Sequence, residues 1–153
     1  MMKLMRLQYE MLNHIKDTDK SLAITATANF GLQRVFSEFL NHFEGTKMII
    51  SKRMLLQGCY KRENLDDSII MKTPQKLLRE DISVYTPDLL VVEWPKTNTN
   101  YTVSEKVIDE VANQSKRVIF KFSTYDPRIK IRDFKKVFYV SPDFSIMYAI
   151  KEL

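Results

Sequence analysis

Residues 21–51 read SLAITATANFGLQRVFSEFLNHFEGTKMIIS, and this stretch decides the fold class. The segment 21–27 is short, apolar and partly β-branched, which predicts a buried strand. A run of apolar residues at helical spacing follows and predicts a helix that ends near Gly45. These residues are Leu32, Val35, Phe36, Phe39, Leu40 and Phe43. Residues 47–51 predict a second strand, so the stretch forms a βαβ unit with parallel pairing and a right-handed crossover.

The segments on either side extend the alternation of helices and strands. Residues 3–16 predict an amphipathic helix, and the less regular residues 52–86 predict one or two helices. A further helix is expected after Thr102 or Ser104. Three more strands are predicted, at residues 89–93 (LLVVE), 117–122 (RVIFKF) and 136–140 (KVFYV). The sequence therefore predicts one α/β domain over residues 1–153, with three layers and a mainly parallel sheet of about five strands.

Composition excludes several classes of protein. The chain has 153 residues, 44% hydrophobic and 28% charged, as expected of an ordinary globular domain. Its one cysteine, Cys59, forms no intrachain disulfide and is typical of a reducing compartment, so we expect a cytoplasmic location. Two histidines are too few for a His-rich metal site. No run of 18 apolar residues occurs, so no contact with a membrane is expected.

The positive charge is concentrated near the C-terminal end of the sequence. Residues 1–114 contain 15 bases and 15 acids, so this part is neutral. Residues 115–137 contain eight bases and two acids and account for the whole net charge of +5. The bases are Lys116, Arg117, Lys121, Arg128, Lys130, Arg132, Lys135 and Lys136. Their local field favours a nucleic-acid backbone or an acidic partner, although a solvated surface has the same composition.

The loop after the first strand has the frame of a phosphate-binding loop without its chemistry. Ligands of open parallel sheets bind at the carboxyl ends of strands, beside helix N-termini. Ala26 and Gly31 have the separation of the two fixed small residues in the frame GxxxxGK[ST]. Leu32 stands at the lysine position and Gln33 at the Ser/Thr position, so charge and the magnesium-binding hydroxyl are both missing. Asn29 completes the candidate loop, whose glycine alternatively only fits a tight turn.

Two later strands carry patterns that accompany such a loop. Residues 88–94 read DLLVVEW, an acidic strand end formed by Asp88 and Glu93, and residues 117–124 read RVIFKFST. In order and spacing, residues 4–125 resemble the first RecA-like ATPase domain of superfamily 2 helicases and phage large terminases. In that resemblance Glu93 takes the metal-supporting position, and Trp94 replaces the catalytic acid. Arg6 and Gln8, ahead of the first strand, resemble the adenine-recognising Arg/Gln segment of these families.

The resemblance implies a non-catalytic descendant of a helicase or terminase ATPase domain. The residues that neutralise the transferred phosphoryl group and orient water are replaced, so no catalytic residue, cofactor or metal is expected. We expect a regulatory protein of phage or mobile-element DNA metabolism, which binds nucleic acid or a protein of a DNA-processing machine. The expected contact surface consists of the strand-end loops 27–33, 94–101 and 123–132 together with the basic segment.

Two alternatives remain open from the sequence. Asp88, Glu93 and Lys96 suggest a metal-dependent nuclease of the PD-(D/E)xK type, in which carboxylates bind Mg²⁺ and lysine polarises phosphate or water. Five positions along a strand, however, point the two acids to opposite faces. The other alternative is a protein-interaction regulator that does not contact DNA. The order of the strands distinguishes these interpretations. If the strands 89–93 and 117–122 flank the strand 21–27, the RecA-like fold is favoured. An antiparallel hairpin in the core would favour the nuclease.

Overall fold

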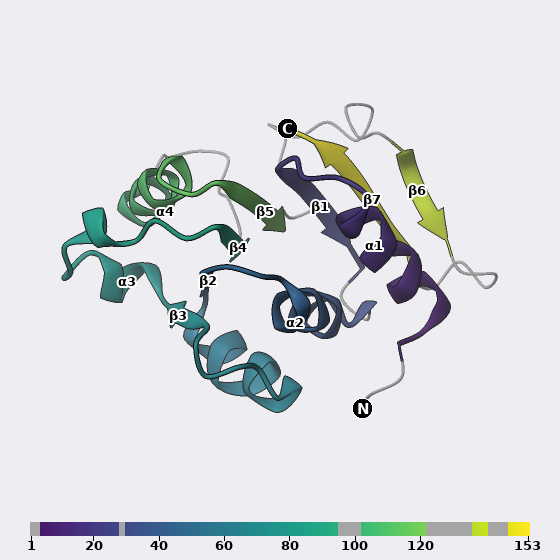
Figure 1. The fold of residues 1–153 in the computed structure, drawn as a ribbon, viewed down its shortest axis with the longest axis horizontal. Coiled ribbons are helices and arrows are strands. Elements are labelled where there is room, and N and C mark those ends of the chain that lie inside the picture. Colours follow the sequence, from purple (N-terminus) through teal and green to yellow (C-terminus); the bar gives the residue numbers. More distant parts are fainter. Residues whose placement is uncertain (1–3, 28–29, 95–101, 122–135, 141–146) are drawn as a thin grey trace.

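The fold is described by a computed structural model that covers residues 4–27, 30–94, 102–121, 136–140 and 147–153, the last segments partly through their backbone alone (Figure 1). The described helices are α1 (Arg6–Lys16), α2 (Leu32–His42), η2 (Leu55–Tyr60), η3 (Lys61–Glu63), α3 (Pro74–Leu77), η4 (Ile82–Val84) and α4 (Val103–Asn113). The described strands are β1 (Leu22–Ala26), β2 (Lys47–Ser51), β3 (Ile70–Lys72), β4 (Leu89–Glu93), β5 (Arg117–Lys121), β6 (Lys136–Val140) and β7 (Met147–Glu152).

The strands of the described residues form a single mixed sheet of seven strands in the order β3-β2-β4-β5-β1-β7-β6. The first five in this order pair in parallel, whereas β7 is antiparallel to both β1 and β6. The expectation of an α/β fold is confirmed, and each of the five predicted strands is present. The sheet is larger than expected because β3 and β7, which the sequence analysis did not identify, add a strand to each half.

The neighbours of β1 agree with the expected arrangement in part. β5 lies beside β1 in parallel, as predicted for residues 117–122. β4 pairs with β5 and lies one strand further away than predicted. The place beside β1 belongs to β7, whose Ala149 and Ile150 are buried where they pair with Thr25 and Ile24. This burial of apolar side chains explains why β7 joins the sheet at that position.

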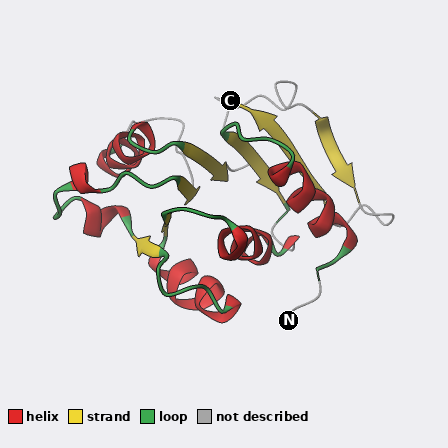
Figure 2. Ribbon diagram, viewed as in Figure 1, coloured by secondary structure: helices red, strands yellow, loops and turns green. Residues whose placement is uncertain are grey.

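Helices lie on both faces of the sheet and give the domain three layers (Figures 1 and 2). The alternation of side chains along β4 shows the two faces clearly. Leu89 and Val91 belong to a core cluster beneath α1 and α2, and Leu90 and Val92 belong to a second cluster beneath α3 and α4. All five residues of β4 are buried, as expected of a parallel strand covered on both sides.

The irregular region 52–86 contains short elements rather than one or two ordinary helices. One of them, α3, begins at Pro74 and is capped by Thr73, whose hydroxyl accepts a hydrogen bond from the Lys76 N–H at 3.2 Å. A threonine cap followed by proline at the first helical position is a strong helix start. The cap places the first turn of α3 directly after β3. In the described part of the chain, no helix is long and apolar enough to cross a membrane.

Candidate functional site

The candidate site lies at the edge of the sheet where the parallel strands end. β1 leads into the loop before α2, and β4 ends at Glu93 on the same edge. Gly31 immediately precedes α2 and has φ 75° and ψ 41°, a left-handed conformation that glycine adopts without steric cost. Residues 28 and 29, and with them Asn29 of the candidate loop, lie outside the described residues.

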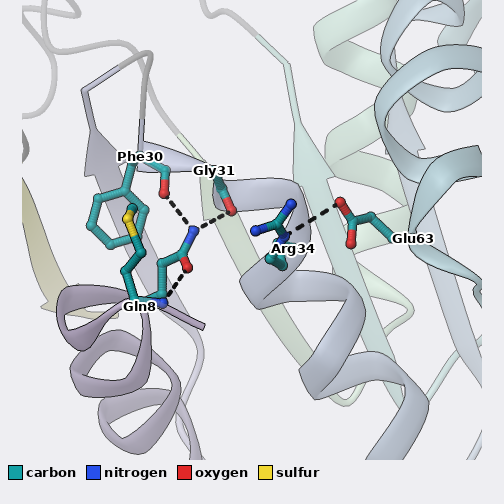
Figure 3. Close-up of polar contacts among 6 residues, drawn as sticks. Gln8, Phe30, Gly31, Arg34 and Glu63 are labelled. Atoms are coloured by element: carbon teal, nitrogen blue, oxygen red, sulfur yellow. Dashed lines mark hydrogen bonds and ion pairs between the residues drawn. The ribbon is translucent and has the colours of Figure 1, made fainter. Parts of the chain in front are cut away.

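Gln8 of α1 fixes the position of this loop (Figure 3). Its buried side-chain amide donates a hydrogen bond of 2.8 Å to the carbonyl of Phe30 and a longer one of 3.5 Å to that of Gly31. Its Oε1 accepts from the Met5 N–H at 2.8 Å. A Cβ atom on residue 31 would lie 2.5 Å from Gln8 Nε2. Gln8, which resembles an adenine-recognising residue, therefore binds the loop backbone in this structure.

The lysine position of the loop faces the core. Leu32 is only 4% exposed and belongs to the cluster beneath α1 and α2, together with Phe30, which is fully buried. An apolar side chain in this place gains from burial and provides no charge at the sheet edge. The structure thus gives a packing reason for the leucine that the sequence shows in place of lysine.

Gln33 and Glu93 meet directly at the sheet edge. The Gln33 amide donates to Glu93 Oε2 at 2.6 Å, although the two residues are 60 positions apart. Tyr60 of η2 donates its hydroxyl proton to Glu93 Oε1 at 2.7 Å. Both carboxylate oxygens therefore accept hydrogen bonds from neutral groups, and the side chains that stand at the Ser/Thr and metal-supporting positions contact each other directly.

Burial dominates the electrostatics of this cluster. Glu93 is 6% exposed, and burial raises the pKa of its carboxyl. The hydrogen bond from Tyr60, the charge of Lys121 and the hydrogen bond from Gln33 act in the opposite direction without cancelling the effect. Burial, followed by the charge of Glu93, raises the pKa of Tyr60 well above its ordinary value. Lys121 pairs with Glu93 across β5 and β4, so it is the basic residue nearest the site in register.

Asp88 is not part of this site. It precedes β4 and lies at the amino edge of the sheet, where it accepts a hydrogen bond from the Thr46 N–H at 2.9 Å. It also forms an ion pair with Lys116 at 3.0 Å. These contacts lower the pKa of Asp88, the bond from Thr46 most of all. Five residue steps along a strand span about 16 Å, so Asp88 and Glu93 cannot ligate one metal ion. Lys96 lies outside the described residues.

Arg117, which the sequence analysis assigns to the binding surface, has a packing role in the structure. Its guanidinium is buried and donates hydrogen bonds to the carbonyls of Lys20, at 2.9 Å, and Ile15, at 2.8 Å. It also lies 5.4 Å from the ring centre of Phe39. Arg117 therefore joins the end of α1 to β5. Lys116 is exposed but lies at the amino edge, away from the candidate site. Side chains of Arg128, Lys130, Arg132, Lys135 and Lys136 lie outside what the structure describes.

A basic cleft beside the candidate site escaped the sequence analysis. It has a volume of about 660 Å³ and is lined by Lys52, Arg53, Thr73, Gln75, Lys76, Arg79 and Trp94. Its residues directly follow the carboxyl ends of β2, β3 and β4, so it opens on the same sheet edge as Glu93. The sequence contains only a local indication of this cleft. Lys52 and Arg53 follow the strand at 47–51, and Lys76 and Arg79 lie in the short segment 74–79.

Comparison with known proteins gives no matching family model and no curated relative.

Proposed function

We propose that this chain is a degenerate RecA-like ATPase domain that has lost hydrolysis and binds nucleic acid at the carboxyl edge of its sheet. The five parallel strands, the loop after β1 and the acid at the end of β4 support the RecA-like part of this proposal. A role in phage or mobile-element DNA metabolism follows from the terminase resemblance. The domain acts by docking and uses no bound cofactor.

The observation that carries the loss of hydrolysis is the direct hydrogen bond between Gln33 and Glu93. In an active loop of this class, a Ser/Thr hydroxyl and an acid support Mg²⁺ beside the phosphates. Here the two side chains bind each other at 2.6 Å, and Tyr60 takes the second carboxylate oxygen. With Leu32 directed into the core, the site has no cation from the loop to neutralise a transferring phosphoryl group.

Turnover of ATP tests this part of the proposal. We expect no phosphate release from ATP with Mg²⁺, because the loop supplies no cation to neutralise a transferring phosphoryl group. ATP hydrolysis that persists through repeated purification and disappears in a Glu93→Ala variant would contradict the proposed loss of hydrolysis.

The basic cleft supports the binding part of the proposal. Lys52, Arg53, Lys76 and Arg79 are all exposed, and none of them forms an ion pair with an acid that the structure describes. No acid occurs among the described residues that line the cleft. Four exposed cations around a concave surface attract a polyanion such as a nucleic-acid backbone.

Fluorescence anisotropy with a labelled oligonucleotide at low salt tests binding. The double variant Lys76→Ala/Arg79→Ala should bind about tenfold more weakly, because it loses two charge-assisted contacts. The double variant Lys16→Ala/Lys20→Ala removes the same charge from the amino edge of the sheet and should bind as the parent does. Equal losses in the two variants would show that only net charge matters, and absence of binding at low salt would contradict the proposal.

A further inference from the structure

Trp94 is the one aromatic residue among the described residues that line the basic cleft. It directly follows Glu93 at the end of β4 and is the only tryptophan of the chain. The side chain is half-buried: it packs against the core cluster beneath α3 and α4 and also lines the cleft. The core contact holds the indole in place, so its exposed part is a preformed aromatic surface within a ring of cations.

The composition of the cleft indicates what such a surface is for. Lys52 and Arg53 line the cleft directly after the end of β2, Lys76 lines it from α3, and Arg79 lines it just after the end of α3. Thr73 and Gln75 add neutral hydrogen-bonding groups. A volume of about 660 Å³ is ample for one nucleotide. An aromatic face surrounded by cations suits a ligand that carries both a flat ring and a phosphate.

We propose that Trp94 stacks on an unpaired base of single-stranded nucleic acid while the four cations bind the adjacent phosphates. This inference rests on the proposed function, because it names the form of nucleic acid that the cleft selects. Bases within a duplex are already stacked on their neighbours and present no free face, so the cleft favours single strands. Stacking on an aromatic side chain tolerates any base, and selectivity for a particular sequence is therefore low.

The fluorescence of Trp94 tests the stacking directly, because no other tryptophan contributes to the signal. Titration with an oligothymidylate should quench the emission in a saturable way, at the concentrations at which a labelled copy gains anisotropy. A duplex of the same length should bind less tightly and leave the emission nearly unchanged.

Two substitutions of Trp94 separate stacking from packing. Trp94→Leu should weaken binding of the single strand about 5- to 150-fold, the range expected for loss of one stacked base. Trp94→Phe keeps an aromatic face and should retain most of the affinity. Circular dichroism and urea unfolding establish that both variants fold, since the indole also contacts the core. Equal affinity of the leucine variant and the parent would overturn the inference.

The remaining outcomes distinguish this inference from the proposed function. Binding of single strand and duplex with equal affinity and without quenching would overturn the stacking but leave nucleic-acid binding intact. Absence of binding to either would overturn both. Polyglutamate serves as an acidic peptide without bases: if it competes as strongly as the oligothymidylate, the cleft recognises an acidic protein segment, and the stacking proposal is wrong.

Discussion

Single residues at the sheet edge set the shape of the candidate site. Gly31 has a left-handed φ of 75°, and a Cβ atom at this position would lie only 2.5 Å from Gln8 Nε2, closer than ordinary side-chain contacts. Two separate constraints therefore require glycine at this position: the backbone conformation and the space beside Gln8. The phosphate-loop resemblance explains a glycine here equally well, but the contact with Gln8 explains it without any ligand.

Substitution of Gly31 by alanine should destabilise the protein by about 1–3 kcal/mol, the range for a non-glycine residue held in a sparsely populated conformation. Urea unfolding at equilibrium measures this change. Gly58→Ala is the matched control, because a Cβ there meets nothing within 4 Å. It should leave stability unchanged or raise it by about 0.4–1 kcal/mol. Similar effects of the two substitutions would contradict the constraint inferred for Gly31.

The buried carboxyl of Glu93 should make stability depend on pH. Its pKa is raised in the folded state, so the folded protein favours the protonated form. This contribution is fully present below the pKa of the unfolded chain, about 4.3, and is lost as the pH rises through the folded-state pKa. The stability of the parent relative to Glu93→Gln should therefore fall over that window. The exposed residue Glu110 provides the control, because Glu110→Gln also removes one carboxyl. If the free energy of unfolding depends on pH in the same way for the parent and for Glu93→Gln, the prediction is wrong.

At the scale of the elements, sequence patterns predicted the strands themselves better than they predicted which strands pair with each other. β2 and β4 are continuous apolar runs, so burial on both faces was visible in the sequence. β3 has three residues, and its Ile70 and Met71 are about 40% and 39% exposed, so it carries no comparable signal. β7 was missed because its pairing with β1 depends on a distant segment rather than on a local pattern.

Long-range contacts also explain which residues of the candidate site could be predicted from the sequence and which could not. The loop positions Gly31, Leu32 and Gln33 followed from local spacing, whereas the bond from Gln33 to Glu93 joins residues 60 positions apart. The basic cleft draws its cations from two short segments of a region whose total charge is zero, so an average over residues 1–114 concealed it. Conversely, Arg117 looked like a surface base because strand ends are often solvated.

The connection that Arg117 makes between α1 and β5 predicts a large effect on folding. Arg117→Leu leaves the carbonyls of Ile15 and Lys20 without their donor, and we expect a loss of about 2–4 kcal/mol in the free energy of unfolding. Lys116→Leu is the control at the adjacent position, where the side chain is 80% exposed and pairs at the surface. Its effect should be much smaller. A stability loss for Lys116→Leu as large as that for Arg117→Leu would contradict the structural role.

On the scale of the whole molecule, the charges divide between the two edges of the sheet. Lys116 and Asp88 neutralise each other at the amino edge, whereas the cleft residues Lys52, Arg53, Lys76 and Arg79 gather at the carboxyl edge. The net charge of +5 does not show this asymmetry, because the four cleft bases belong to residues 1–114, in which bases and acids are equal in number.

This asymmetry predicts how salt affects binding. Four phosphate contacts to a single strand give a slope of about −2.8 in a plot of the logarithm of the binding constant against that of salt concentration. The Lys76→Ala/Arg79→Ala variant should reduce the slope to about −1.4, and Lys16→Ala/Lys20→Ala should leave it unchanged. Anisotropy titrations over a series of salt concentrations measure both. A common slope for all three proteins would show that the cleft does not hold the phosphates.

The position of β1 has a consequence for the order of folding. Both of its partners come from late in the sequence: Ser21 contacts Val118, 97 positions away, and Leu22 pairs with Glu152. During synthesis, β1 and the loop that follows it have no strand beside them until residues 117–152 have emerged. Contacts of such separation form slowly, and an apolar strand without neighbours is prone to aggregation. The segment that carries the candidate loop is thus made well before the strands with which it pairs.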